Sequence, residues 1–214
     1  MALITFPDII KPTNLTFGIT SSSQAFVSEF TGSSQHVKLP TARWYGSATW
    51  QNLSGDDFED LKVFLAQLEG SFNTFEFGDV SRDTPQSGLP STIVLQASSS
   101  YQNFTTQINV ERSSTESTTS ITGTVSAFKK GDYFEITSTS GKELKIVTAD
   151  VNIQNTGSSS VPFVPAMRGT ISAGTNLTHI APRAIVRLTD NEQNSWEIAP
   201  PIIGNFGFSF LESF

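Results

Sequence analysis

The chain has 214 residues, a formal net charge of −7 and no cysteine. This length fits one larger domain or two small ones and allows a core that needs no staples, while the absence of cysteine excludes disulfides, thiolate catalysis and cysteine-based zinc sites. The thirteen basic residues are scattered, so the sequence offers no basic stripe for nucleic acid or for an anionic membrane surface.

The first residues, MALITFPDIIKPTN, have neither a basic segment nor a long apolar run. They do not resemble a secretory leader, and no window of the sequence approaches the length of a membrane span. We therefore expect synthesis and folding in the cytoplasm.

The first 50 residues predict β-strands. Apolar and polar residues alternate in short runs over 15–30 and again over 36–51, where Pro40 and Gly46 mark breaks or edges. These residues are expected to supply the first strands of a sheet.

One helix is predicted after these strands. Ser54 is a suitable N-cap with Asp57 as its capping-box partner, and Gly70 is a natural C′ residue. Acidic residues crowd the first turn, where the helix dipole favours them: Asp56, Asp57, Glu59 and Asp60. An apolar stripe at helical spacing predicts packing against a sheet; it consists of Phe58, Leu61, Phe64, Leu65 and Leu68.

The residues after the helix predict more strands. Phe75 and Phe77 share one face at period two and lead into a charged loop at 78–88. The Ser/Thr-rich stretch 112–122 is either an exposed loop or a twisted, polar edge strand, and the loop is preferred. Further strands are expected within 92–97, 104–110, 128–138, 142–153 and 157–167.

The last part of the chain determines the predicted architecture. Residues 184–188 and 195–198 flank a DNEQN turn and predict a hairpin. Phe206, Phe208 and Phe210 alternate strictly, and we expect their strand to pair inside a sheet built from the N-terminal part. The predicted fold class is mainly β: a β-sandwich with one packed α-helix, formed by 1–88 and 181–214, plus an inserted small β-barrel-like domain at 89–180.

The sequence contains no arrangement typical of an active site. His36 and His179 have no companions at metal-ligand spacing. Glu76, Asp79 and Asp83 could hold calcium, but they lack the alternating ligands and the closing glutamate of an EF-hand loop, so hydrogen bonding in a turn is preferred. We expect no enzyme, no catalytic residue, no cofactor and no metal.

Aromatic residues leave one alternative open. Rings spread through strands usually belong to a core, but they could also stack on sugars as in a lectin; the candidates are Trp44, Tyr45, Trp50, Tyr101 and Trp196. A cell-wall hydrolase, by contrast, would need a carboxylate pair or a metal site.

Two blocks of the sequence resemble a group of phage proteins found among minor-tail and tail-tip genes. The first block has a TG–Q–P–RW–W–L pattern, a helix ending in FL–L–G–N–F and a TP–G loop, carried by Thr31, Gly32, Gln35, Pro40, Arg43, Trp44, Trp50, Leu53, Phe64, Leu65, Leu68, Gly70, Asn73, Phe75, Thr84, Pro85 and Gly88. The second block is similar to a KxGDY…L–V–DV…P–R module of the group, carried by Lys130, Gly131, Asp132, Tyr133, Leu144, Val147, Asp150, Val151, Pro165 and Arg168. The stretch 112–122 departs from the shorter, more apolar connection expected in the group.

This resemblance implies a structural virion component of the distal tail protein class, located in the phage tail. Such proteins form a ring, usually a hexamer, that joins the tail tube protein to the tail-tip hub protein. The implied partners are therefore further copies of this chain and those two proteins, with no nucleic acid and no membrane. The alternative is a carbohydrate- or receptor-binding module at the tail tip, with a glycan as partner, 89–180 as the binding part and Tyr101 and Tyr133 as contacts.

A closed ring uses heterologous contacts, in which one patch meets a different patch on the next copy. We place one such patch in 70–88, where a helix, a strand and a loop follow each other closely. The predicted subunit-interface residues are Phe72, Asn73, Phe75, Phe77, Arg82, Asp83 and Pro85.

Overall fold

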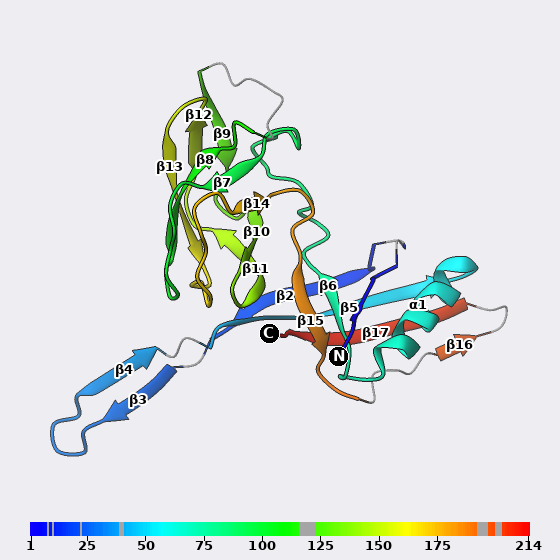
Figure 1. The fold of residues 1–214 in the computed structure, drawn as a ribbon. Helices are drawn as coiled ribbons and strands as arrows, with labels where there is room; N and C mark the ends of the chain where they lie inside the picture. Colours follow the sequence, from blue (N-terminus) through cyan, green and yellow to red (C-terminus); the bar gives the residue numbers. More distant parts are fainter. Residues whose placement is uncertain are drawn as a thin grey trace.

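A computed structural model describes residues 1–7, 9, 11–21, 23–38, 41–115, 123–191, 197–199 and 203–214 of the chain (Figure 1). The fold is mainly β, with one helix and a closed six-stranded barrel, as the sequence predicts. Pro40, Trp196 and residues 116–122 of the Ser/Thr-rich stretch lie outside the described residues.

A seven-stranded sheet is built from segments that lie far apart in the sequence. Its order is β1-β6-β15-β17-β5-β2, and β16 also pairs with β17. The strands are β1 (Leu3–Ile4), β2 (Asn14–Thr20), β5 (Arg43–Leu53), β6 (Thr74–Phe77), β15 (Ala184–Leu188), β16 (Glu197–Ala199) and β17 (Ile203–Glu212). The sheet therefore joins residues near the two ends of the sequence.

The final strand pairs inside this sheet, which confirms that prediction. β17 lies between β15 and β5, with Phe208 opposite Ala48 and Phe210 opposite Gly46. Its three phenylalanines are buried. The predicted hairpin at 184–198 is wrong, because β15 and β16 each pair with β17 instead of with each other. β17 is long enough to pair with β15 and β16 at different places along its length.

The helix α1 (Asp56–Leu68) packs against the sheet through the predicted stripe, all five residues of which are buried. The predicted cap at Ser54 is wrong. The N-cap is Gly55, at φ +66°, and no side chain caps the helix there, because the chain turns into the helix one residue later than the capping box requires. At the other end, Glu69 is the C-cap and Gly70 follows it at φ +69°, as predicted.

The barrel follows the order β10-β11-β13-β8-β7-β14. Its strands are β7 (Leu95–Ala97), β8 (Gln107–Arg112), β10 (Tyr133–Ser138), β11 (Gly141–Val147), β13 (Ser158–Val164) and β14 (Asn176–Thr178). A two-stranded sheet of β9 (Thr124–Phe128) and β12 (Val151–Gln154) adds Phe128 and Ile153 to the barrel core.

The barrel and α1 cover the same face of the seven-stranded sheet. Leu144 of β11 is part of the sheet core, and Tyr133 and Ile146 pack against it. Residues of the opposite face are open to solvent, among them Tyr45, Asn205 and Gly207. The core of the body therefore lies between the sheet on one side and the helix and barrel on the other.

Gly46 shows how closely the central strands approach each other. It lies opposite Phe17 of β2 and Phe210 of β17. A Cβ atom at this position would lie 2.2 Å from the carbonyl oxygen of Thr16 and 2.6 Å from the Phe210 ring. Only a residue without a side chain fits there without displacing backbone.

We expect Gly46→Ala to lower the free energy of unfolding by about 1–3 kcal/mol, the cost of overpacking a core. Gly207→Ala is the matched control on the exposed face, because its Cβ would lie 3.2 Å from the Thr49 side chain and 3.8 Å, an ordinary contact distance, from the Ala48 carbonyl oxygen; we expect a change of about 0.5 kcal/mol or less. Chemical denaturation measures both, and equal values would contradict the packing described here.

Candidate subunit interface

Most of the predicted interface residues lie inside this chain's own structure. Phe75 and Phe77 are buried at 0% and 2% exposure, and their rings pack against Phe208 at 5.7 and 6.0 Å. Asn73 is also buried; its side-chain oxygen accepts a hydrogen bond from the Ala2 nitrogen at 2.8 Å. Because these side chains face the interior, they cannot contact a neighbouring subunit.

The loop that follows β6 connects the sheet to the barrel. Asp83 accepts a hydrogen bond from Arg183 Nη1 at 2.9 Å and pairs with Lys11 at 3.4 Å. Pro85 is buried, and the next residue, Gln86, donates its backbone N–H to Asp132 of the barrel at 2.9 Å. Arg82 is half-buried, and its buried Nη1 atom has no hydrogen-bond partner among the residues that the structure describes. Of the seven predicted residues, Phe72 alone is exposed, at 57%.

The structure offers a different candidate interface, a hairpin that we call the arm (residues 23–38). It consists of β3 (Ser23–Val27) and β4 (Ser34–Lys38), which hydrogen-bond to each other and to no other described strand. In Figure 1 the arm projects beyond one end of the seven-stranded sheet, away from α1. The sequence predicted strands here but not their separation from the sheet.

The arm exposes apolar side chains that nothing in the described chain covers. Phe30 at its tip is 100% exposed, Phe26 is 54% exposed and Val27 is 66% exposed. An isolated two-stranded hairpin is at best marginally stable in water. Exposed apolar residues that gather on one projecting element are typical of a surface that a partner covers.

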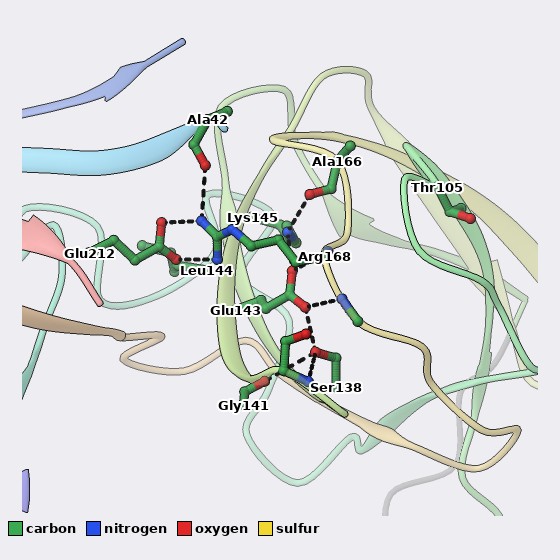
Figure 2. A network of polar contacts seen from close by, with 12 residues as sticks. Ala42, Thr105, Ser138, Gly141, Glu143, Leu144, Lys145, Ala166, Arg168 and Glu212 are labelled. Carbon is green, nitrogen blue, oxygen red and sulfur yellow. Dashed lines mark hydrogen bonds and ion pairs between the residues drawn. The ribbon is translucent and has the colours of Figure 1, made fainter. Parts of the chain in front are cut away.

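A buried polar network stands where the barrel meets the sheet (Figure 2). Lys145 is fully buried and donates to Glu143 at 2.7 Å and to the Ala166 carbonyl at 3.1 Å. Glu143 also accepts hydrogen bonds from Ser138 Oγ and from the backbone nitrogens of Arg168 and Gly169, the latter two at 3.0 Å. Every charge in this pair therefore has several partners.

The pKa values of the pair follow from these contacts. Burial alone raises the pKa of Glu143, but Lys145 and the hydrogen bonds from Ser138 and the backbone outweigh it and hold the pKa below its ordinary value. Burial lowers the pKa of Lys145, and Glu143 opposes that shift. Glu143 and Lys145 share the face of β11 that includes Val147 of the barrel core, whereas Leu144 faces the sheet.

A second ion pair joins the barrel to the sheet. Arg168 Nη1 donates to Glu212 Oε1 at 3.0 Å, and Arg168 Nη2 donates to Glu212 Oε2 and to the Ala42 carbonyl. Glu212, 1% exposed, also accepts the backbone N–H of Trp44 at 2.9 Å. No sequence pattern indicates this grouping, because residues 42, 168 and 212 are far apart in the chain.

The two tyrosines of the carbohydrate alternative are held within the chain. The Tyr101 hydroxyl accepts the Asn109 N–H at 2.6 Å. The Tyr133 ring lies 5.7 Å from that of Trp44, and burial together with Asp79 raises its pKa to about 12. Both residues are half-buried and engaged in contacts within the chain, and neither is a fully exposed ring of the kind that stacks on a sugar.

A groove of about 490 Å³ lies between the N-terminal segment and the loop after β6. Apolar residues such as Phe6 and Val80 line it together with Lys11, Asp83 and Arg183. Asp83 pairs with both Lys11 and Arg183, so these three groups together carry a formal charge of +1.

In the described part of the chain, no three histidine or acidic residues group in a way that could hold a metal ion. Glu76, one of the acids considered for calcium, pairs with Lys142 at 2.7 Å. No helix among the described residues has the length and apolar character needed to cross a membrane.

No protein-family model matches the chain, and no curated protein matches it either.

The Glu143–Lys145 pair predicts an asymmetric response to mutation. Glu143→Gln removes the negative charge that Lys145 contacts at 2.7 Å, and removing one partner of a buried ion pair costs about 3–5 kcal/mol. Lys145→Met should cost less, because Glu143 keeps three other donors. Lys142→Met is the control: its ion pairs are about one-third exposed on the lysine side, and such pairs contribute about 0–1 kcal/mol. Urea denaturation checks the order, and a larger loss in Lys145→Met than in Glu143→Gln would contradict it.

From the burial of His179 we predict how the free energy of unfolding depends on pH. The residue is 4% exposed, and burial lowers its pKa from the ordinary 6.5. The unfolded chain therefore binds a proton more readily than the folded one, so stability falls as pH decreases through about 6.5. We expect His179→Gln to reduce this loss between about pH 7.5 and pH 5, above the ordinary carboxyl range.

The exposed His36 of the arm provides the matched variant for that measurement. Its side chain lies in solvent, so His36→Gln is the control for removing a histidine outside the core. Denaturation curves at several pH values compare the three proteins. An unchanged slope in His179→Gln would assign the effect to other groups.

Proposed function

We propose that this chain is a structural virion protein of a phage tail. It acts as a distal-tail or baseplate ring component that connects the tail tube protein to the tail-tip hub protein. The sequence resemblance supplies the class, and the exposed arm is the observation that supports self-assembly. A protein that works by contact needs such a surface, and the arm is an element that gains stability only when a partner covers it.

The arm also suits a ring contact. Each of its faces carries apolar residues, because Phe26 and Val27 are neighbours on a strand and point in opposite directions. Burying one large apolar side chain contributes about 1.5–3 kcal/mol before entropic costs. We propose that the arm of one copy contacts the next copy. Such a heterologous contact closes a ring when the rotations between successive copies add up to a full turn.

The arm replaces 70–88 as the proposed contact. The buried residues of 70–88 order the connection between sheet and barrel, and Phe72 is the exposed one of the seven interface residues predicted there. The carbohydrate-binding alternative gains no support from Tyr101 or Tyr133, since both are engaged in contacts within the chain.

A comparison of oligomeric states tests the proposal. We expect the purified chain to form a ring oligomer by size-exclusion chromatography with light scattering, and the variant Phe26→Ser/Phe30→Ser to lose it, because the exposed rings can no longer be buried. Phe72→Ser is the matched control from the surface predicted earlier, and it should keep the oligomer. Loss of the oligomer in Phe72→Ser alone would return the contact to 70–88.

A ring that assembles only on a growing tail would escape that measurement. A mass-spectrometric inventory of purified phage particles decides the role directly. Detection of the chain in tails is expected, and its absence from mature particles would overturn the proposed function.

A further inference from the structure

Arg168 is bound to the barrel through its backbone and to the sheet through its side chain. Its backbone N–H donates to Glu143 at 3.0 Å, and the next residue, Gly169, donates to the same carboxylate. Its guanidinium group holds Glu212 of β17 with two nitrogens and the Ala42 carbonyl with one. Figure 2 shows Arg168 between Glu143 on one side and Glu212 on the other.

The surroundings of the guanidinium group make this contact strong. Its side chain is 14% exposed and that of Glu212 is 1% exposed, so water screens the pair only weakly. The Phe214 ring lies 3.6 Å from the Arg168 guanidinium carbon, a distance typical of a cation–π contact. A planar fork that binds a carboxylate with two bonds also fixes direction, which a single contact does not.

The position of this contact in the sheet gives it a mechanical role. The chain passes to and from the barrel through residues 78–94 and 179–183, which leave from β6 and β15. Arg168 instead reaches β17 and the residue before the start of β5, and β17 and β5 follow β15 in the order of the sheet. The barrel is thus attached to the sheet at two neighbouring places, through the chain connections and through Arg168. Two such attachments prevent a rotation of the barrel that one attachment would permit.

Other contacts between barrel and sheet lie beside one or the other of these two attachments. Lys142 of the barrel pairs with Glu76 of β6 at 2.7 Å, and Glu135 accepts the Arg183 N–H at 3.1 Å beside the chain connections. Trp44 Nε1 donates to the Leu144 carbonyl at 2.7 Å on the side of Arg168. The Trp44 backbone in turn donates to Glu212, so the tryptophan contact and the Arg168 contact share one carboxylate.

We propose that the contact of Arg168 with Glu212 and Ala42, which we call the latch, sets the angle of the barrel on the sheet. The latch is closed when this contact is formed and open when it is broken. With the latch closed the two parts form one body; with it open the barrel turns about the two connections. The consequence for assembly rests on the proposed function: in a ring, the latched angle determines the direction in which each barrel faces. Arg168 is thus a positioning residue for the barrel.

A distance measurement within the chain tests the latch. The chain has no cysteine, so Gln51→Cys on β5 and Asn152→Cys on β12, both at exposed positions, accept two spin labels without competing sites. The test variant is Arg168→Met/Glu212→Gln, which removes the fork, leaves no unpaired buried charge and keeps an acceptor for Trp44. Arg187→Met, on the same sheet but outside the network, is the control.

We expect a narrow distribution of label distances in the parent chain and in Arg187→Met, and a broader, shifted one in the test variant. Equal distributions in all three would overturn the latch. If the double variant does not fold, as judged by near-ultraviolet circular dichroism, Arg168→Lys replaces it, since lysine keeps the charge and loses the fork. A narrow distribution in a folded Arg168→Lys would then refute the proposal.

This measurement is independent of assembly. Labelled protein is diluted into unlabelled protein, so that only distances within one chain contribute whether or not rings form. A broadened distribution together with absence of the chain from purified particles would reject the proposed function and retain the latch. The opposite pair of results would reject the latch alone.

Discussion

The pairing of β17 with β5 and β15 is the contact on which the rest of the structure depends. It joins residues 45–53 to 204–211 across most of the sequence, so the whole barrel is inserted between the two paired strands. The phenylalanines of β17 supply the centre of the core: Phe206 packs on Phe58 of the helix at 5.1 Å and Phe210 on Phe77 at 4.9 Å. The same strand brings Glu212 to the barrel. One strand thus orders the sheet, holds the helix and provides the anchor for the inserted barrel.

Charge inside the protein has a positional role. Buried ion pairs contribute little net stability, because removing two ions from water costs nearly as much as their attraction returns. Their value here lies in direction: Glu143 and Glu212 accept hydrogen bonds from defined backbone and side-chain donors on both sides of the junction. An apolar junction of the same size would hold the barrel against the sheet but would leave its angle less defined.

The sequence predicted a subunit contact in 70–88, but the loop after β6 connects the sheet to the barrel, and the proposed contact lies in the arm. The loop is polar and well ordered because it carries the chain from sheet to barrel, and its hydrogen bonds end on Asp132 and Arg183 within this chain. The arm carries one acidic and one basic residue, Glu29 and Lys38, and it exposes Phe26 and Phe30, which are side chains that a partner surface would cover. The proposed ring assembly calls for a rigid body behind a free contact element, and the proposed latch at Arg168 would supply that rigidity.

The sequence by itself determined the local structure. Period-two alternation predicted the strands of the sheet and the buried pairing of the final one, and the 3.6-residue spacing predicted all five buried positions of α1, because these patterns arise from backbone geometry within a few residues. Tertiary structure decided what depends on distant partners. The N-cap is Gly55 instead of Ser54, and β15 pairs with β17 instead of forming the expected hairpin at 184–198. Phe75 and Phe77, predicted at a subunit interface, are buried in the core. The separation of the arm and the grouping of Ala42, Arg168 and Glu212 could not be predicted either, since a linear pattern shows which face of a strand is apolar but not which surface will cover it.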